Sequence, residues 1–310
     1  MWELPSLDVM YSVNRDNVDV NAKNFTPLKV ESDNYQQPTN TFCVRNMFQN
    51  HFYNIKSHMS GFGDFIRGSC SLYNLCKQKN WKLEICFCNY PEMSSCFKCN
   101  HTHPPVDPES VPYIPWPGGY QIVEKYIQND IQQNKTISCL STNIFPRDGS
   151  VTPDFQQFMK EHLQLSDKLQ AKYDSIVGDI PEGTYTVLHL RTPDRYQPKS
   201  ATEYLTKALE HIQLVPKITY VLCMDIEYRD SICEKYGYQK LNTTSSAHLG
   251  IDGDINGTEN TIIEFAFMSK AQCIYAVTPL NYGTGFSEWC AKVYNIPLTY
   301  CICYPEIKFL

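Results

Sequence analysis

The chain has 310 residues, of which 42% are hydrophobic, and is therefore long enough for two domains that each bury a core. Its net charge of -6, with lysine and arginine scattered along the sequence, provides no basic stripe for a nucleic acid backbone, so nucleic acid is not an expected partner. No apolar run reaches the roughly 18 residues of a membrane-spanning helix, so we expect no transmembrane segment in this chain.

The cellular compartment stays open at the level of sequence. The first residues lack the basic start and apolar centre of a secretion signal, and several of the 14 cysteines lie inside apolar runs, where a thiol behaves as a small hydrophobe. These features favour the cytoplasm for the chain as given. A lumenal location is the alternative if a signal or an anchor was removed.

The first half of the chain begins with polar sequence and then shows one α/β unit. Residues 1–40 lack a clear period, which predicts an irregular lead-in. A glycine turn follows at Gly61–Phe62–Gly63–Asp64, then helical spacing over residues 65–79 and the alternation of a strand over residues 82–88. Turn, helix and strand in this order are typical of an α/β unit.

Residues 89–119 are rich in proline, which predicts a long irregular excursion that is either a substrate loop or a packed surface loop. Beyond it the pattern predicts a helix over residues 120–133, a short strand over 136–140 and one long amphipathic helix over 154–173. Glycine and proline then concentrate at residues 178–183, where we expect a domain boundary.

The predicted domains are therefore an N-terminal α/β domain over residues 1–178 and a C-terminal domain over residues 179–310. The second domain alternates strands and helices. Its predicted strands cover residues 185–190, 218–224, 273–277 and 298–303, and its predicted helices cover residues 201–212, 226–236, 259–270 and 286–294. This alternation predicts a parallel, doubly wound sheet and an α/β fold class.

Two motifs in the second domain suggest a phosphate site. His189–Leu190–Arg191 closes a predicted strand, and Gly283–Thr284–Gly285–Phe286–Ser287 joins a later strand to a helix. If both strands end at one edge of the sheet, a guanidinium and a turn of backbone amides converge there, as a diphosphate requires. Two alternatives stay open, namely an ion pair between Arg191 and Asp194 on a solvated turn and a plain helix start at Thr284 or Ser287.

Three blocks resemble the superfamily of α1,2-, α1,6- and protein O-fucosyltransferases. Residues 264–269, 273–277 and 285–289 together look like its carboxyl-terminal block, His189–Leu190–Arg191 is similar to its His-x-Arg motif, and Gly61–Phe62–Gly63–Asp64 resembles its amino-terminal Gly-x-Gly-Asn loop. The resemblance implies a GT-B fold, in which two Rossmann-like domains face a cleft and the second holds most of a GDP-sugar donor. It also implies inverting transfer of fucose from GDP-fucose to a hydroxyl of a glycan or protein acceptor, without a metal or another cofactor.

Carried over residue by residue, the resemblance implies that Arg191 contacts the β-phosphate of the donor and offsets charge on the leaving diphosphate. The donor-binding residues that it implies are Gly61, Gly63, His189, Asp225, Glu264, Thr284, Gly285, Phe286 and Ser287. Asp64, on the facing domain, is the candidate general base for the acceptor hydroxyl, and a carboxylate that only caps the following helix is the alternative.

The sequence departs from the family pattern at three places. Asp64 replaces the usual Asn, Thr192–Pro193 replaces the common Arg-Gly after His-x-Arg, and Glu288 replaces a frequent Trp. These departures bear on the sugar and the acceptor. They leave open a GT-B enzyme with another nucleotide sugar, and also a catalytically inactive nucleotide- or sugar-binding protein of the same fold.

A last motif lies in the proline-rich segment. Cys96, Cys99, His101 and His103 have the ligand types and the spacing of a zinc knuckle, although no second Cys-x-x-Cys follows. A disulfide or ordinary loop residues are the alternatives, and the expected function requires no metal.

Overall fold

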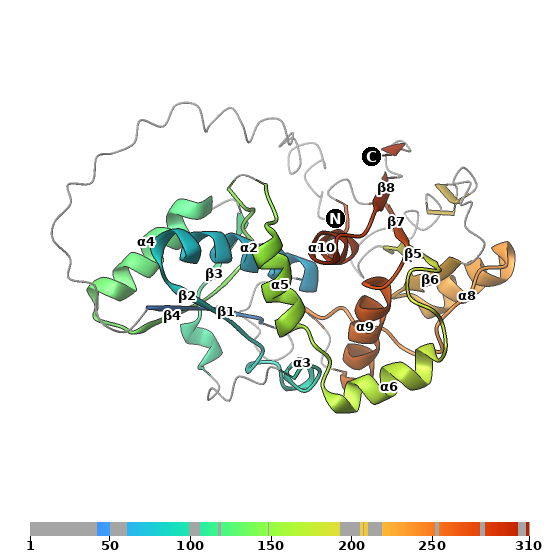
Figure 1. Ribbon diagram of the computed structural model, residues 1–310, viewed down its shortest axis with the longest axis horizontal. Coiled ribbons are helices and arrows are strands. Elements are labelled where there is room, and N and C mark those ends of the chain that lie inside the picture. The colour runs from blue at the N-terminus through green and yellow to red at the C-terminus, as the bar shows by residue number, and fades with distance from the viewer. Residues whose placement is uncertain are drawn as a thin grey trace, which may run out of the picture. The chain divides into compact units, whose positions relative to one another are not determined.

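The computed structural model of the chain consists of two β-sheets, each built mainly of parallel strands, and the helices that connect the strands (Figure 1). The structure describes residues 42–49, 61–98, 106–116, 119–147, 149–192, 205–206, 208–209, 219–251, 254–279, 283–302 and 308–309. Both sheets lie within one compact unit formed by residues 40–310. The predicted irregular lead-in over residues 1–40 and most of the predicted helix over residues 201–212 lie outside the described ranges.

The first sheet has the strand order β2-β1-β4-β3, and all its neighbouring strands are parallel. Its strands are β1 (Cys43–Met47), β2 (Lys82–Cys86), β3 (Tyr113–Ile114) and β4 (Ile137–Thr142). Every residue of β1 is buried, as is every residue of β2 after Lys82. Burial on both faces of a strand is typical of a parallel sheet that helices cover on either side.

The second sheet has the order β6-β5-β7-β8-β9. Its strands are β5 (Thr186–Leu190), β6 (Thr219–Cys223), β7 (Cys273–Thr278), β8 (Leu298–Ile302) and β9 (Lys308–Phe309). Strands β5 to β8 pair in parallel, and β9 adds an antiparallel edge. The α/β fold class is therefore confirmed, while the division into domains 1–178 and 179–310 stays a prediction.

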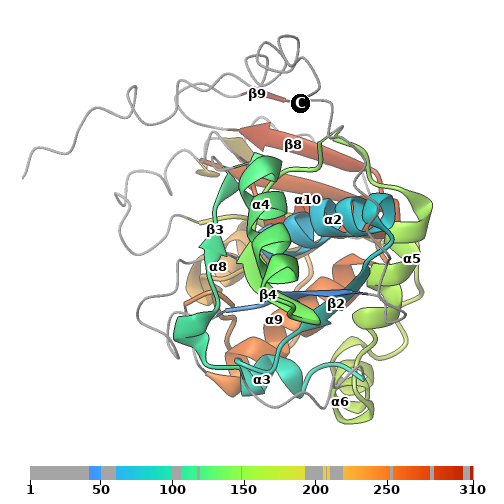
Figure 2. The same cartoon turned by 90° about the vertical axis from the view of Figure 1, so that its left-hand side faces the viewer.

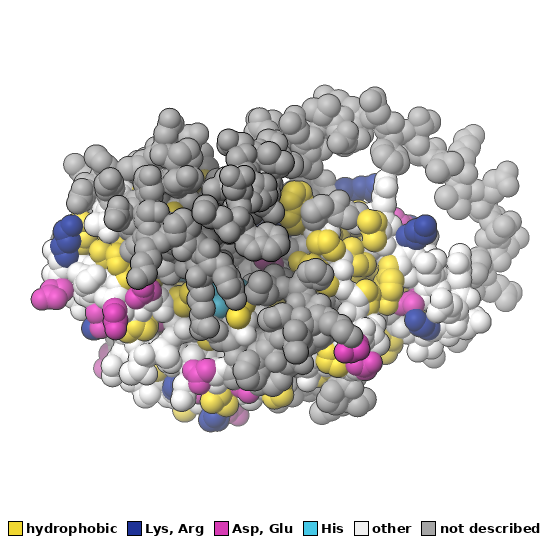
Figure 3. Space-filling view, turned by 180° about the vertical axis from the view of Figure 1, so that it is seen from behind, with side chains coloured by type: hydrophobic (Ala, Val, Ile, Leu, Met, Phe, Trp, Pro, Cys, Tyr) yellow, Lys and Arg dark blue, Asp and Glu magenta, His cyan; other side chains and the backbone are white. Residues whose placement is uncertain are grey.

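Helices connect these strands, as the views in Figures 1 and 2 show. The α-helices are α2 (Phe62–Lys79), α3 (Pro91–Ser94), α4 (Gly119–Gln132), α5 (Pro153–His162), α6 (Asp167–Val177), α8 (Ile226–Tyr236), α9 (Ile255–Met268) and α10 (Gly285–Tyr294). Among the described residues, none of these helices combines the length and apolarity that crossing a bilayer requires. On the face in Figure 3, acidic and basic side chains of the described residues are interspersed.

The single helix predicted over residues 154–173 is wrong, because the chain forms α5 and α6 with a break at residues 163–166. In the break, Leu165 forms an isolated antiparallel bridge with Phe97. Ser166 donates its backbone N–H to the carbonyl of Cys96 (2.8 Å), and its hydroxyl accepts from the backbone N–H of Leu169, which caps α6. The helical pattern is therefore interrupted by partners about 70 residues away.

The first sheet also contains strands that the sequence did not predict. β1 includes Arg45 and Asn46, which are polar and yet buried; Arg45 pairs with Glu84 of β2 at 2.9 Å, and Asn46 donates to Ser69 of α2 at 2.8 Å. The segment 89–119, predicted to be irregular, contributes α3, a short 3₁₀ helix and the edge strand β3. In β1, partners from β2 and α2 thus compensate for polar residues that are unfavourable in a buried strand.

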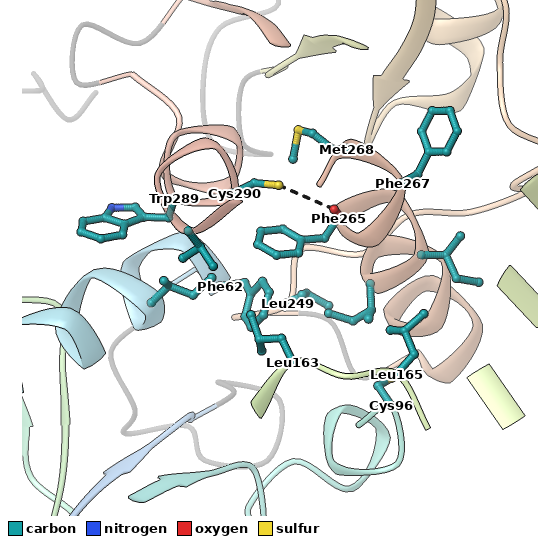
Figure 4. Packing of buried hydrophobic residues seen from close by; sticks show 14 of the residues in the cluster. Phe62, Cys96, Leu163, Leu165, Leu249, Phe265, Phe267, Met268, Trp289 and Cys290 are labelled. Carbon is teal, nitrogen blue, oxygen red and sulfur yellow. Dashed lines mark hydrogen bonds between the residues drawn. The ribbon is translucent and has the colours of Figure 1, made fainter. Parts of the chain in front are cut away.

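A continuous apolar core joins the elements of the two sheets (Figure 4). The ring of Phe62, at the start of α2, packs edge to face on Phe265 of α9, with 5.0 Å between ring centroids. The hydroxyls of Tyr90 and Thr258 are hydrogen-bonded at 2.6 Å. Helix α10 lies beside α2 in both ribbon views. This packing fixes the first turn of α2 against the second sheet, and so brings together residues from both halves of the sequence.

Candidate functional site

The motif at His189 and the motif at Gly283 meet at the carboxyl ends of β5 and β7. These strands are neighbours at the centre of the second sheet, with β6 on the far side of β5 and β8 on the far side of β7. The chain therefore leaves β5 and β7 in opposite directions, which is the switch point where open α/β sheets bind ligands. Arg191 lies just beyond β5 and donates its backbone N–H to the carbonyl of Val277 at 2.9 Å.

His189 connects strand β5 to helix α10. Its Nδ1 shares a hydrogen bond of 3.1 Å with the hydroxyl of Ser287, and its ring lies 5.5 Å from that of Phe286. Burial, together with the nearby charge of Arg191, lowers the pKa of His189 to about 3. The imidazole is therefore neutral at physiological pH. It is suited to hold the first turn of α10 rather than to exchange protons.

Arg191 is half-buried at the edge of the same site. Its Nη1 donates to the carbonyl of Thr192 at 3.1 Å, so the side chain folds back onto the backbone of the next residue. Pro193 and Asp194 lie outside the described residues, and the alternative of an Arg191–Asp194 ion pair stays untested. A guanidinium carries its N–H donors in a fixed fork on a permanent positive charge, which suits phosphate oxygens.

The turn before α10 is held from strand β8. Gly283 has a φ of +81°, a conformation that favours glycine, and a Cβ at this position would lie 3.4 Å from the ring of Tyr300. The Tyr300 hydroxyl donates to the carbonyl of Thr284 at 2.8 Å and contacts Glu288 Oε2 at 3.2 Å. Sequence reasoning missed Tyr300, because nothing local connects it with a turn 16 residues earlier.

The first turns of α2 and α10 meet backbone to backbone. A Cβ on Gly63 would lie 2.1 Å from the carbonyl carbon and oxygen of Gly285 and 2.6 Å from the amide nitrogen of Phe286. The N-cap residues of these helices, Gly61 and Thr284, make no capping hydrogen bond through a side chain. Two helix N-termini with their positive dipole ends are thus brought together, in a geometry that favours an anion.

Asp64 lies in the first turn of α2, directly beside α10. A Cβ on Gly285 would be 3.7 Å from Oδ1 of Asp64, and the same oxygen forms a 2.8 Å ion pair with Nη2 of Arg67. Arg67 also donates from Nε to the carbonyl of Asn143 at 2.7 Å. The structure therefore brings Asp64 to the start of α10, and its role as general base stays a prediction. Sequence reasoning missed Arg67, although its spacing from Asp64 is that of a helical ion pair.

Asp225 follows β6 at the same edge of the sheet and caps α8. Its Oδ1 accepts a hydrogen bond of 2.9 Å from the backbone N–H of Tyr228, and its side chain is otherwise exposed. An aspartate at this position is a common N-cap. Its donor-binding role, which the resemblance implies, stays a prediction.

Glu264 lies in a buried polar network. Its two carboxylate oxygens accept from Thr243 at 3.0 Å and Ser246 at 3.1 Å, and Arg229 donates to Thr243 at 2.7 Å. Burial raises the pKa of Glu264 to about 7, against the effect of these hydrogen bonds and of the charge on Arg229. Both oxygens are thus used in holding residues 243–246 to α9, and contact with the donor stays a prediction for this residue.

The predicted zinc ligands fall only partly within the described residues. Cys96 is buried, and its thiol lies 3.2 Å from the carbonyl of Glu92, to which it donates; burial raises its pKa to about 12. Cys99, His101 and His103 lie outside the described residues, so the zinc alternative is untested. Within the ranges that the structure describes, His, Cys, Asp and Glu form no group of three that could hold a metal ion.

Known proteins resemble this chain in fold rather than in sequence. No family model matches it, and no curated protein matches its sequence at a significant level. A crystal structure of the α1,6-fucosyltransferase NodZ, co-crystallised with GDP, is similar with a TM-score of 0.53 and 12% sequence identity, over 88% of this chain and 99% of that chain. NodZ from Bradyrhizobium gives 0.52 and 11% over the same shares, and NodZ soaked with GDP-fucose gives 0.50 and 11% over 87% and 99%. The chain therefore has the fold of a fucosyltransferase, as its sequence motifs implied.

Proposed function

We propose that this chain is a fucosyltransferase-like glycosyltransferase that binds a nucleoside diphosphate sugar at the carboxyl ends of β5 and β7, with GDP-fucose as the first candidate donor. The observation that carries the proposal is the meeting of α2 and α10 at a switch point, with neither N-terminus capped by a side chain. Backbone N–H groups at such ends require acceptors, and the oxygens of a diphosphate supply them. The fold shared with NodZ, which was crystallised with GDP, supports this choice of ligand.

The positive charge that the reaction needs is available from the chain itself. As the bond from the sugar C1 to the phosphate oxygen breaks, negative charge develops on the leaving diphosphate. The guanidinium of Arg191 and the dipole of α10 are the groups that stabilise it in our proposal. A metal ion would supply the same kind of stabilisation, so these groups support transfer without one.

Inversion follows in this proposal if the acceptor attacks from the side of Asp64. The acceptor oxygen forms a bond to C1 while the bond to the diphosphate breaks, the electron pair leaves with GDP, and the acceptor proton passes to the Asp64 carboxylate. Asp64 belongs to α2, whereas Arg191 follows β5, so base and leaving-group residues come from different sheets. The ion pair with Arg67 at 2.8 Å orients the Asp64 carboxylate until the acceptor arrives.

A nucleotide-binding experiment tests the proposal. GDP, UDP, CMP and GDP-fucose are titrated by calorimetry and in thermal unfolding, because a ligand that binds only the folded state raises its stability. We expect GDP and GDP-fucose to bind selectively, and Arg191→Ala to weaken both by about ten- to a hundred-fold. Arg191→Lys retains the charge without the fork and should fall between the two. Lys235→Ala, which removes one exposed cation from α8, is the control.

Turnover separates an enzyme from a binding protein of the same fold. We expect slow hydrolysis of GDP-fucose by the wild type, unchanged by a chelator and lost in Arg191→Ala and Asp64→Asn. Selective binding of UDP or CMP instead would assign another donor. Binding of GDP with the same background hydrolysis in all variants would mean that the chain binds a nucleotide without catalysis.

A further inference from the structure

Two aromatic rings just beyond the ends of β3 and β4 are exposed side by side. Trp116 is 42% and Phe145 is 50% exposed, and their centroids are 6.0 Å apart in an edge-to-face arrangement. Among the described residues the other large apolar side chains with comparable exposure are Ile122 and Ile255. Exposed aromatic surface costs solvation free energy, and a pair of such rings is therefore a feature that a ligand would explain.

The pair is held in place by polar contacts on the side away from solvent. The backbone N–H of Trp116 donates to Oδ1 of Asn143 at 2.8 Å, and Asn143 accepts from Nε of Arg67 through its own carbonyl at 2.7 Å. The guanidinium of Arg67 lies over the ring of Phe145, 4.2 Å from its centroid. These contacts hold the ring of Phe145 and the backbone of Trp116 at the ends of β3 and β4. The edge-to-face packing of the two rings then completes a surface that is formed before a ligand binds.

The same contacts connect the rings with the proposed catalytic residue. Arg67, which packs on Phe145, forms the 2.8 Å ion pair with Asp64, and Asp64 lies beside Gly285 at the start of α10. Burial and then the charge of Asp64 raise the pKa of Tyr113 to about 12, against the effect of the charge on Arg67. One continuous set of contacts therefore runs from the two helix N-termini to the aromatic pair.

We propose that Trp116 and Phe145 form the docking surface for a sugar ring of an oligosaccharide acceptor, an inference that rests on the proposed function. The C–H groups on one face of a sugar ring carry partial positive charge and pack on the negative face of an aromatic ring. The neighbouring carboxylate and guanidinium of Asp64 and Arg67 suit its hydroxyls, which both donate and accept. Two rings offer far less area than the roughly 800 Å² per partner of a standard protein interface, which favours a glycan over a folded protein as the occupant.

Acceptor kinetics and direct binding test this surface. The probes are tetrasaccharides of β-linked glucose, galactose and N-acetylglucosamine, measured by saturation-transfer NMR on the whole chain and, with GDP-fucose, as acceptors in transfer. We expect Trp116→Ala and Phe145→Ala each to raise the KM for the preferred tetrasaccharide about ten-fold or more. GDP affinity and donor hydrolysis should remain within two-fold. Trp116→Phe and Phe145→Tyr retain a ring and should lose at most about three-fold.

Ile122→Ala is the matched control, because it truncates an apolar side chain of α4 that is 52% exposed and lies outside the aromatic pair. Transfer with an unchanged tetrasaccharide KM in both alanine variants would overturn the surface and leave the proposed function intact. Saturation transfer that weakens equally in Ile122→Ala would do the same, as would an acceptor activity confined to proteins or peptides. Absence of binding by GDP, UDP and CMP alike in the wild type would instead refute the proposed function, and the acceptor surface with it.

Discussion

Helices α8, α9 and α10 of the second sheet, and α2, which packs against α10, begin in two different ways. Helices α8 and α9 are capped by aspartates, because Asp225 accepts from the N–H of Tyr228 at 2.9 Å and Asp254 from that of Gly257 at 2.7 Å. The N-cap residues of α2 and α10, Gly61 and Thr284, make no side-chain capping hydrogen bond. The uncapped pair lies at the proposed donor site. In our proposal the aspartate caps of α8 and α9 serve the fold, whereas the backbone N–H groups at the starts of α2 and α10 bind a ligand.

The largest expected effect comes from separating the two uncapped starts. Gly63→Ala places a Cβ 2.1 Å from the backbone of Gly285, where no flexible side chain can move aside. We expect a loss of about 3 kcal/mol or more in the free energy of unfolding, measured in urea, with loss of GDP binding. Gly61→Ala is the control, because its nearest neighbour, Cε1 of His248, would be 4.0 Å away. Equal small losses in both variants would mean that the helix starts are not in contact.

A smaller, pH-dependent effect is expected at Glu264, which lies in the capped helix α9. Its pKa is raised by burial from 4.5 to about 7. Between pH 4.5 and 7, therefore, the carboxyl is protonated in the folded state and ionised in the unfolded state. The associated stability is complete below about pH 4.5 and is lost as pH rises through 7. Glu264→Gln does not titrate at this position. Its unfolding free energy, relative to that of the wild type, should therefore rise by about 2 to 3 kcal/mol between pH 4.5 and 8.

Denaturant melts of both proteins across this range measure the difference. His189 titrates in the opposite direction in the wild type and in the variant alike, since its lowered pKa destabilises both below pH 6.5. The comparison of the two melts therefore isolates Glu264. Parallel curves for the two proteins would show that this carboxyl is ionised in the fold.

Asp225→Ala tests the structural interpretation of the capped starts. Loss of the N-cap of α8 should cost about 1 kcal/mol in unfolding free energy, and Asp254→Ala, at the start of α9, should cost a similar amount. GDP affinity should stay unchanged in both, as measured by calorimetry. A ten-fold loss of GDP affinity in Asp225→Ala alone would support the donor-binding role that the family resemblance implies for this residue.

Local sequence predicted the second sheet well, because its signals are local. The helix over residues 226–236 has an aspartate cap before it and a glycine after it, and the predicted strand over 273–277 matches β7 to within one residue. Apolar runs and capping residues lie within a few positions of the elements that they define. The convergence of His189 with Ser287 followed from one topological rule about parallel strands.

The first sheet depended on partners that the sequence does not reveal. The buried charge of Arg45 in β1 is compensated by Glu84, 39 residues later, and the break between α5 and α6 by residues near Phe97. Asp64 was predicted as a site residue, but its connection with the aromatic pair was not. That connection depends on contacts among residues 67, 116 and 145, which lie far apart in the sequence. Such contacts form only when the sheet is complete, so the periodicity of apolar residues along the chain does not predict them.

The smallest expected effect concerns how the turn before α10 is held. Tyr300→Phe removes the hydroxyl that donates to the carbonyl of Thr284 at 2.8 Å but retains the ring beneath Gly283. We expect a cost of about 0.5 to 1.5 kcal/mol in unfolding free energy and a loss of GDP affinity of a few-fold, because the amides of α10 become less well oriented. Tyr275→Phe, on neighbouring strand β7, should leave GDP affinity unchanged. If GDP binds Tyr300→Phe as tightly as the wild type, the order of this turn does not limit binding, and the uncapped start of α10 is sufficient by itself.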